Sequence, residues 1–425
     1  MIDGYDLPDE APGEYIPLRE DRGLAKAYRP NPLPPKLAVS SEIVEELTSA
    51  AYALGQLDGV AGEVEQRNAI FSSFVYKEAE QSSQIEGTRV TVSDIRRYEM
   101  GADKIEQLEA SEDELDDIRE AKNYIQALSE GISHFNEVGR SWKNIDQSLL
   151  KSIHETLMVG GRTDEDDLMP GEFRYDHGDF VVIKEEESWK KPIRFVPPKP
   201  NMAHADLDAL IEYIQSGGDY PTLIDIALIH YQFETIHPFR DGNGRVGRLL
   251  IILLLISGDT LAHPVLYLSS YFRQFRDQYT DLLLNVSEKG VWEEWILFFL
   301  TGIRRQAEEA FVRAKLLLVL RDRYKTTYAT APTSVSRLTE GLISKPYFSV
   351  NEAAEMMGMT YQSASNAIEQ LVADGRVRQF NDQRRNRIFE AIDVTAIIEY
   401  DYAQLPEPRD VVDRDTVDLP LDIGP

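Results

Sequence analysis

The residues HPFRDGNGRVGR, at positions 237–248, run directly into the apolar stretch LLIILLLI at 249–256. A glycine-rich turn ahead of a helix exposes free backbone N–H groups and the positive end of the helix, an arrangement that suits a phosphate. Arg245 and Arg248 are three residues apart, so they lie on one helix face, where guanidinium groups can bind further phosphate oxygens. These features predict an anion site at the start of a helix.

Two other side chains in this stretch add chemistry to the predicted anion site. Asp241 offers a carboxylate of the kind that holds Mg²⁺ against phosphates. His237 lies four residues earlier and is the residue type most often used as a general base. A helix N-cap with a solvated basic turn would explain any one of these residues, but not their combination.

Residues 242–247 also satisfy the pattern G-x-G-x-x-G of dinucleotide-binding folds. That pattern requires a strand before it, whereas the preceding residues ETIHPFRD end a predicted helix and form a turn. The sequence G-x-x-x-x-G-K-[ST] does not occur, so a P-loop is excluded.

The stretch resembles the signature of the Fic family of nucleotidyl transferases, H-P-F-x-[DE]-G-N-G-R-x-x-R, at every specified position. The resemblance implies transfer of AMP from ATP to a Tyr, Thr or Ser hydroxyl of a target protein, including itself, with release of pyrophosphate. A branch of the family that transfers phosphate has lysine at the second glycine, and Gly244 therefore favours nucleotidyl transfer. By the resemblance, His237 is the base, Asp241 holds Mg²⁺ and Phe239 packs in the core. The remaining implied ATP contacts are Gly242, Asn243, Gly244 and Arg245 in the anion cradle and Arg248 at the γ-phosphate.

A second stretch, EAEQSSQIEGTRVT at 78–91, on its own indicates an ordinary helix that ends at a glycine. Beside the first motif it resembles the family's inhibitory helix, [ST]-x-x-x-E-[GN], in Ser82, Glu86 and Gly87. ALGQLDGV at 53–60 resembles the N-terminal region of the same class. A glutamate paired with Arg248 would keep this arginine from the γ-phosphate, and we expect an auto-inhibited enzyme.

The runs DFVVI (179–183) and IRFV (193–196) are rich in β-formers and flank KEEESWKKP, a pattern that predicts a hairpin after PGEFR (170–174). A surface hairpin is one interpretation; the resemblance implies a flap that holds the target peptide by strand addition. Lys184 stands where many relatives have glycine. The expected nucleotide contacts of the flap are Val181, Val182, Ile183 and Lys184.

Residues 266–286 resemble a family segment in which YF-x-x-NR-x-x-YY is common. Phe275 and Thr280 depart from this pattern, while Tyr279 is retained and is expected to stack on the base, or to be plain core. These departures affect the base pocket, and hence the choice of nucleotide, more than the chemistry. His154, His204 and His230 are expected to have core or surface roles.

The C-terminal block 348–391 predicts two helices separated by a turn and then two strands, and it resembles a winged helix-turn-helix. Its wing is basic, but the second helix, TYQSASNAIEQLVADG, carries no lysine or arginine. We therefore expect a protein contact or a homodimer contact rather than DNA binding. The wing arginines are Arg376, Arg378, Arg384, Arg385 and Arg387.

The chain has 425 residues, no cysteine and a formal net charge of −28. Disulfides are excluded, and a field of this sign disfavours nucleic acid and anionic membranes. The longest apolar run, 249–256, is too short to span a bilayer, and the acidic N-terminus is not a signal peptide, so a cytoplasmic location is expected. Residues 106–120 are expected to form an acidic, solvated helix.

The fold expected from these patterns is mainly α. It comprises a Fic-type helical core with a β-hairpin flap, an N-terminal helical region and a small C-terminal winged helix-turn-helix. The alternatives are a winged-helix DNA-binding regulator with a nucleotide-sensing core, or removal of AMP by the reverse reaction at the same site. The expected divisions are an extended lead-in (1–40), the helical region with the inhibitory helix (41–133), the catalytic core (134–305), a linker helix with the winged helix (306–400) and an acidic tail (401–425).

Overall fold

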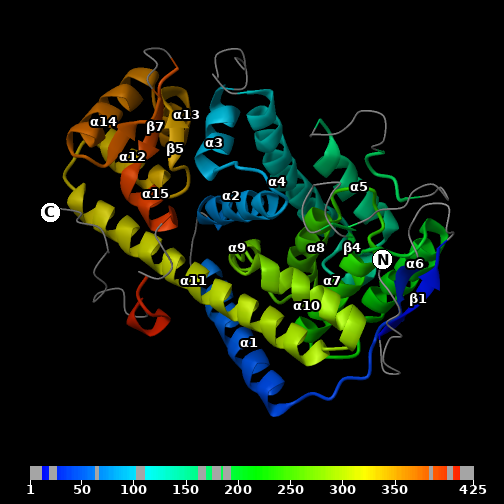
Figure 1. Cartoon of the computed structure of the whole chain (residues 1–425). Helices are drawn as coiled ribbons and strands as arrows, with labels where there is room; N and C mark the ends of the chain where they lie inside the picture. The colour runs from blue at the N-terminus through cyan, green and yellow to red at the C-terminus, as the bar shows by residue number, and fades with distance from the viewer. Residues whose placement is uncertain are drawn as a thin grey trace.

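The structure is a computed structural model that describes residues 12–18, 26–62, 67–101, 111–160, 169–174, 183–184, 193–381, 386–399 and 405–411. Helices make up most of this part of the chain, and its small sheets are antiparallel (Figure 1). The mainly α prediction is confirmed. None of the helices in these ranges is long and apolar enough to cross a membrane.

Part of the expected extended lead-in forms a pair of strands. Strands β1 (Gly13–Pro17) and β2 (Lys26–Pro30) pair antiparallel, with Tyr15 opposite Tyr28. The two tyrosine rings meet edge to face at 5.9 Å, and the Tyr28 N–H donates to the carbonyl of Val196 at 2.9 Å. Because this second contact joins distant parts of the chain, local sequence gives little sign of it.

The N-terminal helical region wraps one side of the core. The helix α1 packs along α11, as Figure 1 shows, and α2 packs against α4 and α9. A capping box between Ser111 and Glu114 starts α4. The expectation of a fully solvated acidic helix at 106–120 is wrong where the structure describes it, because Asp117 and Glu120 are buried. The bounds are α1 Ser41–Gly62, α2 Arg67–Ile85, α3 Val92–Gly101 and α4 Glu112–Val138.

The centre of the core is formed by α7 (Thr222–Ile236) and α8 (Asn243–Ser257), which are buried along almost their whole length. Leu223 to Ile229 and Leu249 to Ile256 are apolar around most of the helix circumference, which is typical of helices enclosed on all sides. The surrounding elements are the 3₁₀-helix η3 Trp142–Asn144, α5 Gln147–Met158, β3 Ile183–Lys184, β4 Ile193–Phe195, α6 Pro200–Ser216, α9 Ser269–Gln274, α10 Arg276–Lys289 and α11 Trp292–Thr327.

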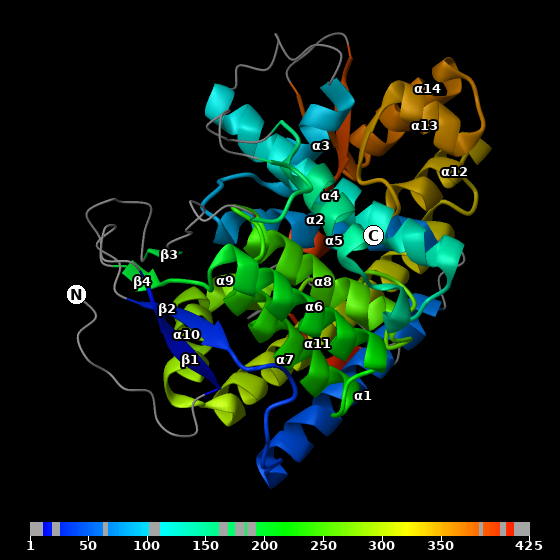
Figure 2. The same ribbon diagram turned by 90° about the vertical axis from the view of Figure 1, so that its right-hand side faces the viewer.

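The C-terminal elements form a three-stranded antiparallel sheet of order β5-β7-β6 with helices packed on it. The expected helix, turn at Gly358, second helix and two strands are present, while the assignment to the winged helix-turn-helix class stays a prediction. Figure 2 shows α12, α13 and α14 on one side of the helical body and β1, β2 and β4 on the other. The bounds are α12 Thr333–Leu342, β5 Tyr347–Ser349, α13 Val350–Met357, α14 Tyr361–Ala373, β6 Val377–Gln379, β7 Ile388–Ala391, α15 Ile392–Glu399 and the 3₁₀-helix η5 Pro408–Val411.

The helices α11 and α3 connect the C-terminal elements to the rest of the chain. The helix α11 is continuous from 292 to 327 and so passes through the boundary expected at 305/306. The helix α3 contacts β5, and the Arg97 guanidinium lies 4.9 Å from the centre of the Phe380 ring. Of the wing arginines, Arg384 and Arg385 lie outside the described residues; Arg378 pairs with Glu390 at 2.7 Å.

Candidate active site

The loop between α7 and α8 begins at His237, which ends α7 in the left-handed conformation with φ of 52°. Such a backbone is uncommon for a residue other than glycine and persists only where neighbours hold it. Its N–H donates to the carbonyl of Phe233 at 3.0 Å, which closes the last turn of the helix. The histidine side chain is thereby turned away from the helix axis at a fixed position.

Arg174 is the neighbour that holds this turn. Its side chain is buried, with 1% exposed, and Nε donates to the carbonyl of His237 at 2.7 Å. Nη2 donates to the carbonyls of Ile236 at 3.0 Å and Pro198 at 3.2 Å, while the Arg174 N–H donates to Pro238 at 2.9 Å. The last residue of PGEFR thus caps the end of α7, a role that the sequence analysis missed.

The ring of His237 is set up to accept a proton through Nε2. Nδ1 lies 3.2 Å from the carbonyl oxygen of Glu234, and only a protonated Nδ1 can donate to it. In the neutral ring Nε2 then carries the lone pair. Burial lowers the pKa of His237 to about 4, and the Arg174 guanidinium acts in the same direction. The imidazole is therefore neutral at neutral pH.

Aromatic stacking holds the loop in place through Phe239. The Phe239 ring is fully buried between His154, stacked at 3.8 Å, and Phe173, at 4.9 Å. His154 Nδ1 accepts from the N–H of Gly171 at 2.9 Å, so Nε2 carries the hydrogen and donates to the carbonyl of Asp241 at 3.1 Å. Both Phe239 and His154 thus lie in the core; for His154 a core or a surface role was expected.

The Asn243 side chain braces the same loop. It accepts from the N–H of Phe239 at 2.8 Å and donates to the Phe239 carbonyl at 2.9 Å. The side chain is therefore used inside the loop, and only the backbone of Asn243 remains for the predicted anion cradle.

The first turn of α8 has backbone N–H groups without intrahelical partners at the place predicted for that cradle. Gly242 precedes the helix with φ of 74°, and the first intrahelical bond runs from the Val246 N–H to the Gly242 carbonyl at 3.0 Å. The N–H groups of Asn243, Gly244 and Arg245 come before this bond, and they carry the positive end of the helix.

A carboxylate already lies at this helix end. Glu86 Oε1 accepts from Arg248 Nη2 at 2.6 Å, and a Cβ added at Gly244 would lie 2.5 Å from the same oxygen. Arg248 Nε also donates to Ser82 Oγ at 2.9 Å and Nη2 to the Ser82 carbonyl at 3.1 Å. The lack of a side chain at Gly244 therefore makes room for an anion, and Glu86 is the anion that occupies it.

The Glu86 and Arg248 charges stabilise each other. Loss of solvent would raise the pKa of Glu86, but Arg248 outweighs this and lowers it. Burial alone would lower the pKa of Arg248, while Glu86 raises it overall. Both groups are charged at neutral pH. Gly87, which ends the segment with φ of 104°, lets the chain turn away beyond Glu86.

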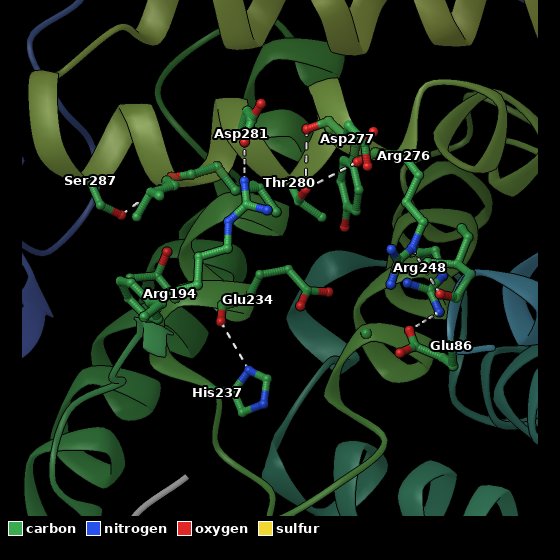
Figure 3. Close-up of a pocket in the computed structure, with 17 residues that line it drawn as sticks. Glu86, Arg194, Glu234, His237, Arg248, Arg276, Asp277, Thr280, Asp281 and Ser287 are labelled. Carbon is green, nitrogen blue, oxygen red and sulfur yellow. Dashed lines mark hydrogen bonds and ion pairs between the residues drawn. The ribbon is translucent and has the colours of Figure 1, made fainter. Parts of the chain in front are cut away.

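A cavity of about 610 Å³ opens beside these groups, and His237, Gly244 and Arg248 of the motif line it (Figure 3). Asp241, Gly242, Asn243 and Arg245 are not among its lining residues. The other lining residues are Ile85, Glu86, Arg194, Phe195, Glu234, Thr235, Arg276, Asp277, Tyr279, Thr280, Asp281, Leu283, Leu284 and Ser287.

Arg245 faces the protein interior instead of the cavity. Its Nη1 pairs with Glu120 of α4 at 2.9 Å, and Nη2 lies 3.7 Å from Asp241 Oδ2. Its guanidinium therefore joins the loop to α4, in place of the direct anion contact that was predicted. Glu120, like Arg174, was missed in the sequence.

Asp241 is the candidate ligand for Mg²⁺. Its carboxylate is 58% exposed, and Oδ1 accepts from the Gly242 N–H at 2.6 Å. The described residues contain no group of three or more His, Cys, Asp or Glu side chains that could hold a metal. One open carboxylate fits Mg²⁺, which proteins often bind through one or two carboxylates plus substrate phosphates and water.

Residues 44–133 match the Fic/DOC family N-terminal domain, and residues 144–255 match the Fic/DOC family. These two regions of the chain are therefore similar to the Fic/DOC family. A curated relative from Aquifex aeolicus (strain VF5), named a probable protein adenylyltransferase, is 24% identical over 199 residues, 44% of this chain and 53% of the relative. The chain therefore spans about half the length of that relative.

The Fic fold itself is seen in a solved structure of a Fic family protein from Desulfovibrio desulfuricans G20. It matches with a TM-score of 0.53 and 17% identity over 84% of this chain and 98% of the other. A likeness at this identity establishes the fold alone.

One wall of the cavity is formed by α10. Tyr279 is 4% exposed, its ring stacks on Phe272 at 4.5 Å, and Oη lies 2.8 Å from His230 Nε2. Tyr279 thus packs in the aromatic core and also lines the cavity. Thr280 lines the cavity, whereas Phe275 packs on Tyr271.

The flap is described in part. Val181 and Val182 lie outside the described residues, and Ile183 and Lys184 form β3, paired with β4. Arg194 and Phe195 of β4 line the cavity, and Arg194 pairs with Asp281 of α10. This ion pair joins the strand β4 to α10 at the wall of the cavity.

Proposed function

We propose that this protein is a Mg²⁺-dependent, auto-inhibited protein adenylyltransferase. It would transfer AMP from ATP to a Tyr, Thr or Ser hydroxyl, including hydroxyls of its own chain. The observation that carries the proposal is the shared cavity, which is lined both by His237, whose Nδ1 contacts a carbonyl, and by the helix end at which Glu86 binds Arg248.

The residues divide the reaction between them. His237 Nε2 accepts the proton of the target hydroxyl, whose oxygen forms a bond to the α-phosphorus. The bond from that phosphorus to the bridging oxygen breaks, and pyrophosphate leaves. Asp241 would hold Mg²⁺, which neutralises phosphate charge when bound. The N–H groups at the start of α8 and Arg248 position the phosphates, and positioning with charge neutralisation accounts for most of the catalysis of such transfers.

The inhibited state follows from the Glu86 contacts. Because the Glu86 carboxylate binds Arg248, the Arg248 guanidinium is not available to the γ-phosphate. The Glu86 carboxylate also places a negative charge beside the position of the triphosphate. Release of Glu86 would free the Arg248 guanidinium and remove the negative charge. The relative named a probable protein adenylyltransferase supports the same activity for this chain.

Labelling with α-³²P-ATP and Mg²⁺ tests the proposal on three proteins: the unaltered chain, Glu86→Gly, and Glu86→Gly combined with His237→Ala. We expect weak label on the first, strong label on the second and none on the third. Absence of label from all three, with lysate supplied as target and the other nucleoside triphosphates tried, would refute the transferase.

A further inference from the structure

Glu234 is a carboxyl group of the cavity that the mechanism above leaves unused. It lies on the last turn of α7, and its backbone carbonyl accepts from His237 Nδ1. Its side chain points into the cavity, between His237 and the pair of Glu86 with Arg248 (Figure 3).

The position of this carboxyl group depends on a glycine of the motif. A Cβ added at Gly247 would lie 2.3 Å from Glu234 Oε1 and 3.2 Å from a ring carbon of Phe233. The carboxyl group therefore lies directly against the backbone of α8. Glu234 Oε1 is buried and has no hydrogen-bond partner among the described residues. A buried polar atom without a partner is costly, and it marks a place where a ligand can supply one.

Two carboxyl groups compete for one guanidinium at this place. Glu86 takes Nη2 of Arg248. Burial raises the pKa of Glu234 to about 7, Arg248 opposes this rise, and the Glu86 charge adds to it. The other titratable or charged side chains of the cavity are His237 from the end of α7, Tyr279, Arg276, Asp277 and Asp281 from α10, and Arg194 from β4.

Entry of a triphosphate changes the charge around Glu234. Departure of Glu86 leaves Arg248 as the nearest fixed charge, which favours the ionised carboxylate. A bound nucleotide then brings several negative charges into the same space, and an ionised carboxylate would repel them. A neutral carboxyl group has an O–H that can donate to a phosphate oxygen, whereas the carboxylate can only accept.

We propose that Glu234 takes up a proton from solvent when the nucleotide enters, and meets its phosphates as a neutral hydrogen-bond donor. This rests on the proposed function, because the ligand is taken to be a nucleoside triphosphate. Its consequence is a nucleotide affinity that falls as pH rises. The fall approaches about tenfold per pH unit where one whole proton is taken up.

Titration calorimetry of the Glu86→Gly protein with Mg²⁺ and α,β-methylene-ATP measures this proton. Runs between pH 7 and 8.5, each in two buffers of different ionisation enthalpy, give the number of protons bound with the nucleotide. We expect net proton uptake with the nucleotide within this range. Adding Glu234→Gln, which imitates the neutral acid, should keep binding and abolish both the uptake and the pH dependence. Asp277→Asn, at an exposed carboxyl group of the same cavity, is the matched control and should leave the uptake unchanged.

The outcomes distinguish a failure of this inference from a failure of the proposed function on which it rests. Nucleotide binding with no proton uptake, or with equal uptake in the Glu234→Gln protein, would overturn the role of Glu234 and leave the nucleotide site standing. No nucleotide binding by Glu86→Gly would overturn both. If Glu234→Gln does not fold, the infrared spectra of the Glu86→Gly protein with and without nucleotide test the role of Glu234. Their difference must contain the C=O band of a carboxyl group that becomes protonated when the nucleotide binds. Absence of that band refutes the proposal.

Discussion

Replacing Glu86 with glutamine keeps the size of the side chain and one oxygen for Arg248, but removes the charge. A hydrogen bond between charged partners contributes about 1.5–3 kcal/mol, and one with a neutral partner about 1 kcal/mol. The Glu86 carboxylate is 40% exposed, so solvent screening reduces the difference to about 1 kcal/mol. Since 1.4 kcal/mol corresponds to tenfold, we expect the labelling rate to rise about threefold to tenfold.

The assay is the initial rate of AMP incorporation from α-³²P-ATP, at ATP concentrations below saturation and equal protein concentrations. Glu86→Gly should be faster than Glu86→Gln, because it removes the remaining acceptor as well. Ser82→Ala is the matched control: it removes the acceptor of Arg248 Nε and leaves the charge in place, so it should label more slowly than Glu86→Gln. A Glu86→Gln protein as inactive as the unaltered chain would refute the electrostatic reasoning and leave only steric blocking by the segment.

Three further predictions concern the loop and its supports. In Arg174→Lys the shorter, unforked lysine cannot contact all three carbonyls that Arg174 binds. Because an unsatisfied buried acceptor costs about 1–3 kcal/mol, we expect the free energy of unfolding in urea to fall by about 2–4 kcal/mol and kcat to fall as well. The kcat of Glu86→Gly at saturating ATP should show no inflection near pH 6.5 and should fall only toward pH 4, because His237 loses its lone pair below a pKa of about 4; an inflection at the ordinary histidine value would contradict its burial. Glu120→Gln breaks the buried pair with Arg245 and should cost about 3–5 kcal/mol in thermal unfolding, whereas Glu112→Gln on an exposed part of the same helix should cost almost nothing.

The motif residues could be predicted because their signals are local. A glycine-rich turn before an apolar run indicates where α8 starts, and the structure begins this helix at Asn243. The supports of the site could not be predicted in this way. The contact of Arg174 with His237 spans 63 positions and that of Glu120 with Arg245 spans 125. Nothing in the neighbouring residues indicates either contact.

The acidic stretch at 106–120 is a second case in which long-range contacts could not be predicted from local sequence. Its composition is typical of a solvated helix, yet Asp117 accepts from the Arg89 N–H at 2.9 Å and Glu120 holds Arg245. Charge composition thus predicted correctly only the exposed first turn of α4, Glu112 to Glu114. It could not reveal which carboxylates have a buried partner, because the partners come from other parts of the chain.

The 36 residues of α11 form one uninterrupted helix, which is about 54 Å long at 1.5 Å per residue. Its first part packs in the core, and its later turns contact α12 and α15. Over this length, a tilt of the helix by about 5° would displace its far end by about 5 Å. Distance labels on α12 and on the core would therefore measure whether the C-terminal helices and sheet keep one position relative to the core.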